Sequence, residues 1–190
     1  SRVLEQIGAA IGRFRQRNQA VQIELISAMP AELERRLLQD QLQLAIGYFS
    51  GNQNALDHQL LFSEQQTLYC AASHPLFSQP VITREELDRC DHVQHAYRSI
   101  SIHQPLQASL SSARCEQVEG SLAFILSGAH IGYLPQHIAA PWVANGRLRA
   151  LLPEQLGFNV DFHLTSHRGR HPGDAQLAFV EDMLGAFGPA

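Results

Sequence analysis

The chain has few cysteines and lacks any long hydrophobic run. Cys70, Cys90 and Cys115 are an odd number of thiols without CxxC spacing, which excludes a disulfide framework and a cysteine-based zinc ribbon. We expect reduced, mostly buried thiols, and a redox pair of Cys90 and Cys115 stays open as an alternative. No apolar run approaches the length of a membrane span, and the first residues lack a signal-peptide pattern. We therefore expect a cytoplasmic protein without a membrane partner.

Positive charge is also scarce. The formal net charge is -4, and no run of Lys or Arg occurs. Because phosphates demand a basic protein face, this segment is not expected to grip nucleic acid. An apolar fraction of 45% with 17% charged residues is typical of a globular protein. The length of 190 residues allows one domain or two small lobes.

Motifs that carry catalysis are absent from the sequence. It contains no P-loop, no GxSxG, no HExxH and no GxGxxG after a strand. His163, His167 and His171 are each four residues apart, but Gly169 and Pro172 would interrupt a helix that aligned them. We interpret them as surface histidines near a loop. We expect no catalytic residue, no metal site and no cofactor, and hence a protein that is not an enzyme.

Hydrophobic spacing in the first fifty residues predicts helices that alternate with strands. Apolar residues at helical spacing predict a helix up to Asn18, and we expect a preceding strand and an upstream domain outside this sequence. "VQIELISA" (21–28) alternates like a strand, residues 29–41 suit a helix with Pro30 in its first turn, and "LQLAIGYF" (42–49) is a continuous apolar strand. The order strand, helix, strand predicts a right-handed parallel unit.

The rest of the chain continues this alternation. Residues 58–64 and 66–75 are two strand candidates separated near Glu64, and strands are also expected at 147–153 and 158–167. Thr83 and Glu86 form a capping box, so Glu85 and Glu86 are interpreted as a helix start rather than an acid/base pair. Further helices are expected from near Ser121, from Pro135 to the stop at 145–146, and over 174–188.

The run "SGAHIGYLP" (127–135) joins two of these elements. Gly128 is expected to end a helix, Ile131 to Leu134 to form a short buried strand, and Pro135 to open the next helix. A helix, a strand and a second helix in this order favour an α/β sheet covered by helices. Small or polar residues at such junctions suit ligand binding, so a binding module fits better than an enzyme.

Several phrases in the chain resemble the effector-binding domain of LysR-type transcriptional regulators. They are "ELISAMPAELERRLLQDQLQLAIG", "LLFSEQQTLYCAASHPL", "ITREELDR", "VEGSLAFILSGAHIGYLP" and "NGRLRALLP". The resemblance implies an α/β fold with two Rossmann-like lobes joined by two crossover strands, like type II periplasmic binding proteins. Lobe I would comprise residues 1–70 and 153–190, and lobe II residues 71–152. "TLYCAAS" and "RLRALLP" are the expected crossover strands.

The chain departs from the family pattern at a few positions. His130 stands where the family usually has a glycine, so we expect some left-handed backbone strain there. Asp40 and Gln43 replace a common glycine and aspartate, which affects the local turn. The family's winged helix-turn-helix is missing from the sequence.

The resemblance implies a domain that binds a small-molecule effector between its lobes and modulates transcription through a DNA-binding domain outside this chain. The alternatives are a solute-binding protein or transport component of the same fold, and an enzyme on the same scaffold for which no residues can be named. The DNA partner would be contacted only through the missing N-terminal domain. A homodimer is expected, with a higher oligomer in the full-length protein, and Leu33, Leu37 and Leu126 could supply apolar contact or face their own core.

Matching positions to the family pattern gives an expected effector site. Tyr48 and Tyr97 would offer apolar walls with polar tips, and Arg98 would be the counter-ion of an anionic effector. The full expected set is Ser1, Met29, Pro30, Tyr48, Tyr97, Arg98, Ser99, Gly120 and Ser121.

Overall fold

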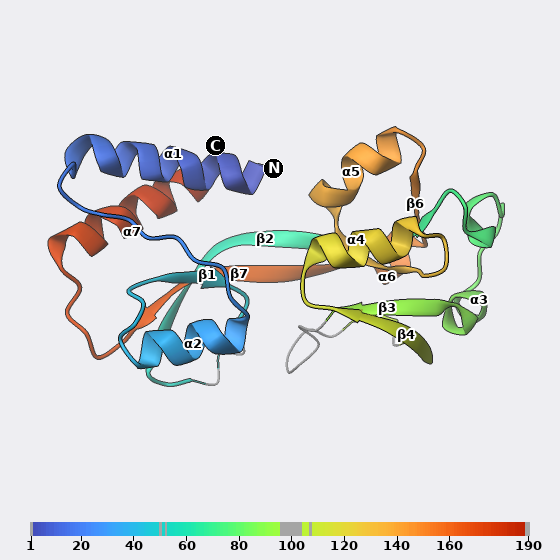
Figure 1. Ribbon diagram of the computed structural model, residues 1–190, viewed down its shortest axis with the longest axis horizontal. Coiled ribbons are helices and arrows are strands. Elements are labelled where there is room, and N and C mark those ends of the chain that lie inside the picture. The colour runs from blue at the N-terminus through green and yellow to red at the C-terminus, as the bar shows by residue number, and fades with distance from the viewer. Residues whose placement is uncertain (1, 50, 52, 96–103, 107, 189–190) are drawn as a thin grey trace. The chain divides into compact units, whose positions relative to one another are not determined.

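The computed structural model describes residues 2–49, 51, 53–95, 104–106 and 108–188 of the chain. These residues form helices and strands in the alternating order expected of a mixed α/β protein, which confirms the predicted fold class (Figure 1). The chain divides into two compact units. Unit 1 comprises residues 1–63 and 161–190, and unit 2 comprises residues 64–160. The lobe bounds that the family resemblance implies, residues 1–70 with 153–190 and residues 71–152, stay a prediction.

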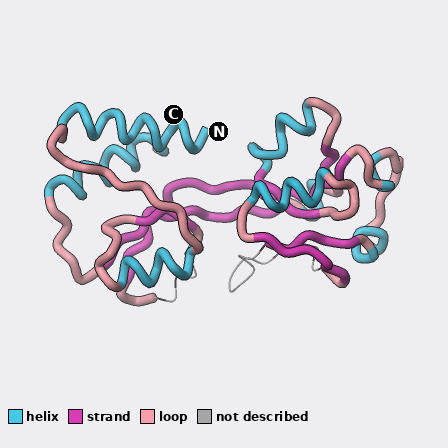
Figure 2. The backbone as a smooth tube through the Cα atoms, in the orientation of Figure 1, coloured by secondary structure: helices cyan, strands magenta, loops and turns pink. Residues whose placement is uncertain are grey.

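Figure 2 distinguishes the helices and strands of the two units by colour. Unit 1 contains α1 (Arg2–Arg17), α2 (Pro30–Leu38), β1 (Ala45–Gly47) and α7 (Asp174–Phe187). Strands β2 (Leu56–Ala71) and β7 (Phe158–His167) each contribute residues to both units. Unit 2 contains η1 (Pro75–Phe77), α3 (Arg84–Arg89), β3 (Asp91–His95), β4 (Leu110–Cys115), α4 (Val118–Leu126), β5 (Gly132–Pro135), α5 (Gln136–Ala144), β6 (Leu148–Ala150) and α6 (Pro153–Leu156).

Strand pairing differs from the parallel unit that the sequence predicts. The larger sheet has the order β1-β7-β2-β5, with β6 also paired to β2. β1 pairs with β7 in the antiparallel sense, with Ile46 opposite Leu164. Residues 21–28 form no strand, so the predicted strand there and its parallel pairing with 42–49 are wrong. The parallel pair in the described chain is β3 with β4 in unit 2.

β2 is one continuous strand of 16 residues rather than the two strands predicted on either side of Glu64. Its polar residues near that point still alternate across a strand, so they do not interrupt it. The crossover strands predicted at "TLYCAAS" (67–73) and "RLRALLP" (147–153) both lie inside unit 2, so neither phrase itself crosses between the units. β6 pairs with Tyr69–Ala71 of β2 inside unit 2, and β7 is the second strand shared by both units.

Unit 1 places helices on both faces of its strands. α1 and α7 pack together on one face, where the Phe14 and Phe179 rings meet edge to face at 5.2 Å. α2 covers the other face, because Leu33 and Leu37 lie four residues apart on one helical stripe and pack with Ala45 and Leu56. Leu33 and Leu37 are therefore buried in their own core and do not supply the apolar dimer contact considered above.

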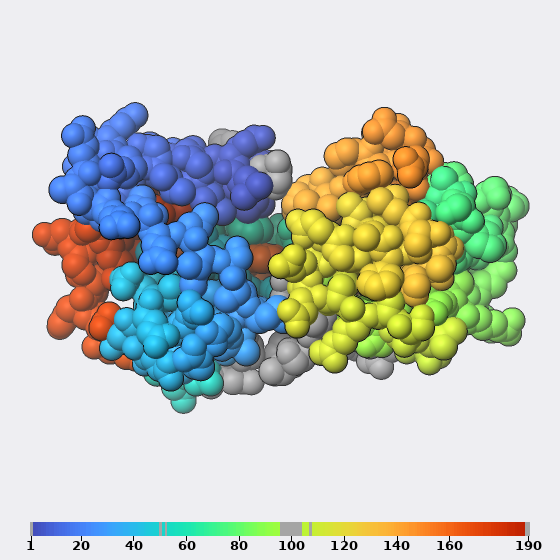
Figure 3. Space-filling view, viewed as in Figure 1, coloured from blue at the N-terminus to red at the C-terminus, as the bar shows by residue number. Residues whose placement is uncertain are grey.

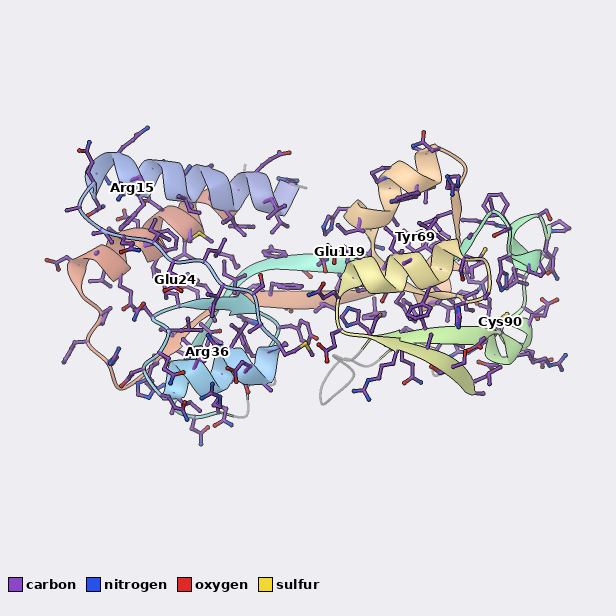
Figure 4. The ribbon with its side chains drawn as sticks, viewed as in Figure 1. Arg15, Glu24, Arg36, Tyr69, Cys90 and Glu119 are labelled. Carbon is purple, nitrogen blue, oxygen red and sulfur yellow. The ribbon has the colours of Figure 1, made fainter. Side chains whose placement is uncertain are left out.

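Unit 2 is built around the last residues of β2. Leu68 and Cys70 point into a cluster with Leu151 and Leu156, whereas Tyr69 faces the opposite cluster. That second cluster lies under α4 and contains Ile125 and Leu134. Both faces of this part of β2 are buried, which explains its continuous apolar run. Figure 4 marks Tyr69 close to α4.

Turn and cap geometry matches much of the sequence pattern. The capping box of Thr83 and Glu86 is confirmed, because each side chain bonds the other residue's backbone N–H. Gly128 ends α4 with φ of +78°, as predicted. Asp40 adopts φ of +59°, so it takes the left-handed conformation that a glycine would favour. The prediction of left-handed backbone strain at His130 is wrong, because the φ angle of His130 is not positive.

Candidate functional site

In unit 2 the carboxyl ends of two parallel strands meet the start of a helix. His95 and Cys115 are the last residues of β3 and β4 and lie opposite each other in the parallel register. α4 begins at Val118, soon after Cys115, and packs against both strands. Ligands of α/β proteins bind at this kind of edge, because helix N-termini and free backbone N–H groups point there.

The first turn of α4 has N–H groups available for a ligand. Gln117 is the N-cap, but its side chain makes no capping hydrogen bond. The N–H groups of Gly120 and Ser121 both donate to the Gln117 carbonyl, at 3.1 and 3.2 Å. In the described chain, no acceptor is recorded for the N–H groups of Val118 and Glu119, as is usual in a first helical turn. The start of α4 can therefore donate hydrogen bonds to a bound group.

Gly120 and Ser121 hold the Cys115 thiol against this turn. The Cys115 Sγ and Ser121 Oγ atoms are 2.9 Å apart, and either can be the donor. A Cβ added at Gly120 would lie 3.0 Å from the Cys115 Cβ, so the glycine allows the close approach of β4 and α4. Ser121 is 2% exposed. Its hydroxyl therefore faces the thiol in the unit 2 interior.

His95 and Glu119 add titratable groups beside the same strand ends. Burial lowers the pKa of His95 to about 4, and the Glu119 carboxylate opposes this shift. The imidazole is therefore neutral near pH 7, where it can offer both a donor and an acceptor nitrogen. Glu119 lies at the start of α4 in Figure 4. The surface of α4 and its neighbours, yellow in Figure 3, forms much of the face of unit 2 turned toward the viewer.

A small pocket lies along β3 in unit 2. Burial raises the pKa of the Tyr133 phenol in its wall to about 12, so the hydroxyl stays protonated. The Tyr133 ring packs edge to face against Phe158 at 5.0 Å, which fixes its orientation. The wall offers imidazole, amide and phenol groups among apolar side chains, but the cavity volume of about 20 Å³ is room for roughly one water molecule. The lining residues are His92, Val93, Gln94, His95, Gln104, Leu106, Ala108 and Tyr133.

Unit 1 contains a second group of expected site residues. Met29 is the N-cap of α2 in extended conformation, and Pro30 occupies the first turn, where its missing N–H costs nothing. Tyr48 follows β1, and its ring meets Phe162 edge to face at 5.9 Å. α2 and β1 are in contact, so these residues belong to adjacent elements.

A histidine lies beside this group. The Phe49 ring covers Gly47, because an added Cβ there would come within 3.1 Å of it, and the same ring lies 5.6 Å from the His58 ring. The His58 Nδ1 atom is 2.9 Å from the Thr165 hydroxyl. Burial lowers the pKa of His58, and His163, with ring centroids 6.1 Å apart, lowers it further. This half-buried imidazole is neutral near pH 7.

The expected site residues are thus only partly placed. Ser1, Tyr97, Arg98 and Ser99 lie outside the described residues. Met29 and Pro30 come together at α2, and Gly120 and Ser121 come together at α4. Sequence reasoning missed His58, His95 and Cys115. The signal for His95 and Cys115 was their place at strand ends, but the parallel register of β3 and β4 was needed to pair them.

The other sequence hypotheses about metal and thiol chemistry can be compared with the geometry. His163 and His167 lie on strand β7, and no group of three or more His, Cys, Asp or Glu among the described residues could hold a metal ion. All three cysteines are free thiols. Burial raises the pKa of Cys90 and raises that of Cys70 to about 11, which keeps both protonated. No helix within the described ranges is long and apolar enough to span a membrane.

Comparisons with known proteins agree on one family. The model of the LysR substrate binding domain matches residues 4–188. The HTH-type transcriptional activator BauR of Pseudomonas aeruginosa is 31% identical over 179 residues, which cover 93% of this chain and 59% of BauR. The chain thus spans less than two thirds of that relative.

Solved structures show the same fold. The effector-binding domain of QuiR in complex with shikimate aligns with a TM-score of 0.78 at 13% identity, covering 95% of this chain and 90% of that one. The regulatory domain of Synechocystis PCC6803 CcmR in complex with 2-PG aligns with a TM-score of 0.77 at 14% identity, covering 98% and 93%.

Proposed function

Because the chain belongs to the LysR substrate-binding domain family, we propose that it senses a small-molecule effector and passes the signal to a DNA-binding part of a longer protein. Two observations support the proposal. BauR, which matches over most of this chain, is a transcriptional activator. Two structurally similar domains hold small molecules, shikimate in QuiR and 2-PG in CcmR. Such coupling requires the effector to bind two states of the domain with different affinity.

The single observation that carries the binding role is the start of α4. There the ends of parallel strands β3 and β4 meet free N–H groups of Val118 and Glu119, beside the neutral imidazole of His95. This arrangement can hold an acceptor-rich group, such as a carboxylate, with hydrogen bonds from the backbone. Gly120 is part of the proposed contact surface, because it keeps the turn free of a side chain. Ser121 would act by fixing the Cys115 thiol or by turning its hydroxyl to the effector.

The full set of proposed effector contacts includes residues of both units. In unit 1 these are Ser1, Met29, Pro30 and Tyr48, and in unit 2 they are Tyr97, Arg98, Ser99, Gly120 and Ser121. Arg98 is proposed as the counter-ion if the effector is an anion, because a guanidinium matches carboxylate geometry. The support for this set is the match of positions to the family, together with the place of Met29, Tyr48 and Gly120 at the ends of secondary-structure elements.

The proposal also covers how the longer protein would bind DNA. The chain itself has a net charge of -4, and the positive charge of the pair Arg35 and Arg36 is partly offset by Glu32, whose carboxylate contacts both guanidinium groups at 2.6 Å. These two arginines hold the pKa of Glu32 at about 2, so it stays charged. DNA binding would therefore come from a part of the longer protein outside this sequence. We propose a cytoplasmic regulator without enzymatic turnover.

A homodimer is the proposed assembly of the domain. We propose α2 and α4 as the contact helices, although Leu33 and Leu37 of α2 face the core. On α4, Phe124 is partly exposed, and Leu126 is half-buried against its own unit. The support for pairing is family membership, and sedimentation velocity at increasing concentration tests it. A monomer at all concentrations would contradict the dimer.

The binding proposal is tested by thermal shift with a library of small carboxylic acids, amines and sugars. We expect at least one compound to raise the melting temperature of residues 1–190 in a saturable manner, because binding to the folded state alone stabilises it. Arg98→Ala should raise the dissociation constant of an anionic compound found in the screen by about tenfold or more. Arg114→Ala is the matched control, since Arg114 is exposed on β4. Equal affinity in both variants would remove Arg98 from the site.

A further inference from the structure

A carboxyl group and an imidazole meet in unit 2 at the start of α5. The Glu64 Oε1 atom lies 3.4 Å from the His137 Nδ1 atom, and the Gln66 amide donates to Glu64 Oε2 at 2.8 Å. Glu64 lies on β2 and His137 in the first turn of α5, so the contact joins two elements. The Glu64 side chain is 13% exposed, whereas that of His137 is 33% exposed. None of these three residues is among the proposed effector contacts.

The groups around the Glu64 carboxyl suit its protonated form. Burial raises the pKa of Glu64 to about 7, and the hydrogen bond from Gln66 opposes this shift. Burial lowers the pKa of His137, and the positive charge of the N-terminal amino group lowers it further. At neutral pH a protonated Oε1 is therefore positioned to donate to the neutral imidazole, while Oε2 accepts from Gln66. Ionisation removes this donor and leaves a carboxylate with little access to water.

α5 is a helix that a small change in free energy can shift. It has nine residues, and its N-cap, Pro135, makes no side-chain hydrogen bond with the first turn. Pro141 lies inside the helix and has no N–H, so it cannot donate to the His137 carbonyl four residues before it. Helices this short are marginal without packing. The first turn of α5 therefore depends on its contacts with neighbouring elements, which include the contact between Glu64 and His137.

The place of Glu64 on β2 gives this contact a structural role. β5 ends at Pro135, opposite Gln66 of β2, so the backbone ladder between these strands does not reach Glu64. At Glu64 a side chain, rather than the backbone, links β2 to the segment that follows β5. Glu64 is also the first residue of unit 2 on a strand that contributes residues to both units. A change at this carboxyl therefore acts on the stretch of β2 that is shared between the units.

We propose that Glu64 and His137 form a proton-controlled latch, which holds the first turn of α5 against β2. With the proton on Glu64 the pair is neutral and the latch is closed. When the proton leaves for water, the buried carboxylate turns toward solvent to be hydrated, and the first turn of α5 moves away from β2. Through β2, pH near neutrality would then bias the two states of the sensor. That consequence rests on the proposed function, whereas the latch itself does not.

The single tryptophan of the sequence lies on α5 and provides a readout without any ligand. Trp142 is partly buried against the cluster of Ile125 and Leu134, and the Arg147 guanidinium lies 5.7 Å from its ring centroid. We expect the emission maximum of residues 1–190 to shift to longer wavelength as pH rises, because water gains access to the ring. The midpoint should lie near pH 7, where Glu64 loses its proton.

Two substitutions and a matched control test the assignment. Glu64→Gln keeps the neutral form of the side chain, so its emission should stay at the low-pH value throughout. His137→Ala removes the partner, so its emission should stay at the high-pH value throughout. Glu154→Gln changes an exposed carboxyl on α6 and should titrate like wild type. A wild-type transition in Glu64→Gln or in His137→Ala would overturn the latch, and so would a wild-type protein without any transition.

The N-terminal amine also titrates between about pH 7 and 8 and needs its own control. Because the sequence contains no lysine, acetylation with an amine reagent modifies this amine alone. We expect the acetylated protein to keep the transition, and its loss on acetylation would overturn the role of Glu64. Far-UV circular dichroism should stay close to constant over the same range, and loss of the helical signal would replace the latch with unfolding. Failure to find an effector leaves all of these results interpretable.

Discussion

The two units satisfy their backbones to different degrees. In unit 2, the end of β2 is paired with β5 and β6 and is buried on both faces. In unit 1, β1 pairs on one side and residues 22–28 have no backbone partner among the described residues. Residues 21–28 alternate apolar and polar side chains, whereas the end of β2 is continuously apolar, and both patterns are typical of strands. The difference shows that an apolar pattern makes a strand only where a neighbouring strand is available.

The two units also differ in how they accommodate a buried carboxyl group, and here unit 1 supplies the better partners. In unit 1, Asp182 of α7 is 5% exposed and is neutralised by Arg17 at 2.8 Å and Arg13 at 3.6 Å on α1. In unit 2, Glu64 is largely buried, with the Gln66 amide at 2.8 Å and the His137 imidazole at 3.4 Å. Burial raises the pKa of Glu64 to about 7 and lowers that of His137. Unit 1 therefore holds a paired buried charge, whereas unit 2 holds a carboxyl that titrates near neutrality.

The largest expected effect on stability comes from core substitutions, which compare the packing of the two units. Leu134→Ala in unit 2 should lower the free energy of unfolding by roughly 3–5 kcal/mol, because Leu134 is fully buried in a closed cluster. Leu61→Ala in unit 1 should cost about 2–3 kcal/mol, since its cluster consists mainly of half-buried side chains that can move into the space. Urea denaturation measures both, with Leu110→Ala at an exposed position as the control. A larger loss for Leu61→Ala than for Leu134→Ala would contradict the comparison.

The paired charge in unit 1 can be broken directly. Asp182→Ala should destabilise the protein by about 1–3 kcal/mol, because it removes the charge-assisted hydrogen bond that Arg17 of α1 donates to Asp182 of α7 and the ion pair of Asp182 with Arg13. The cost stays moderate because Arg13 and Arg17 are partly exposed and can be hydrated after the change. Glu181→Ala, on the exposed side of α7, is the matched control and should have little effect. Thermal unfolding in low and high salt checks both, and equal losses would remove the ion pair as the cause.

The buried carboxyl in unit 2 predicts a loss of stability at alkaline pH. The folded pKa of Glu64 is about 7, above its ordinary value of 4.5, so the folded state binds the proton more tightly than the unfolded state. Its contribution is therefore present below pH 4.5 and is lost as pH rises through 7. The free energy of unfolding of Glu64→Gln relative to wild type should therefore be higher at pH 8 than at pH 5, by on the order of 2 kcal/mol. A difference between wild type and variant that does not change with pH would contradict this assignment.

The acid side of the profile depends on His95 in the same unit. Its folded pKa of about 4 lies below the ordinary value of 6.5, so protonation favours the unfolded state. Stability from this group is present above pH 6.5 and is lost as pH falls toward 4. His95→Gln should reduce the loss of unfolding free energy between pH 7.5 and pH 4.5 by about 1–2 kcal/mol. Urea titrations at pH 4.5 and 7.5 check the prediction, and an unchanged acid limb would show that His95 is hydrated in solution.

The smallest effects come from two glycines and have opposite signs. Gly8→Ala on the exposed side of α1 should stabilise unit 1 by about 0.5–1 kcal/mol, because no atom lies within 4 Å of the added Cβ and alanine favours a helix. Gly128→Ala in unit 2 should destabilise by about 1 kcal/mol or more, since φ is +78° and the new Cβ would lie 2.2 Å from the Ser73 hydroxyl. Melting temperatures of the two variants should shift in opposite directions. A shared direction would contradict the local geometry.

The sequence predicts elements whose signal is local and misses those that depend on a partner. Helices α1, α4 and α7, the capping box of Thr83 and the stop at Gly128 all follow from patterns within a few residues. The strand expected at 21–28 failed because strand pairing is a tertiary property. β2 was divided near Glu64 because a buried carboxyl in a strand resembles a turn in the sequence alone.

The candidate site was predictable only in part for the same reason. Gly120 and Ser121 could be named from the family phrase "VEGS", which lies at the start of α4. His95 and Cys115 could not be joined without the parallel register of β3 and β4, because twenty residues of sequence do not define which strand ends meet. The neutrality of His95 depends on burial by segments remote in sequence, so its pKa cannot be inferred from neighbouring residues.

The sensor role is tested most directly by fluorescence anisotropy with labelled operator DNA. We predict sub-micromolar, salt-sensitive binding by the full-length protein, with an affinity that changes when a compound found by thermal shift is added. Residues 1–190 alone should not bind, because their net charge is -4. Sub-micromolar, salt-sensitive binding of the operator by residues 1–190 alone would contradict the account.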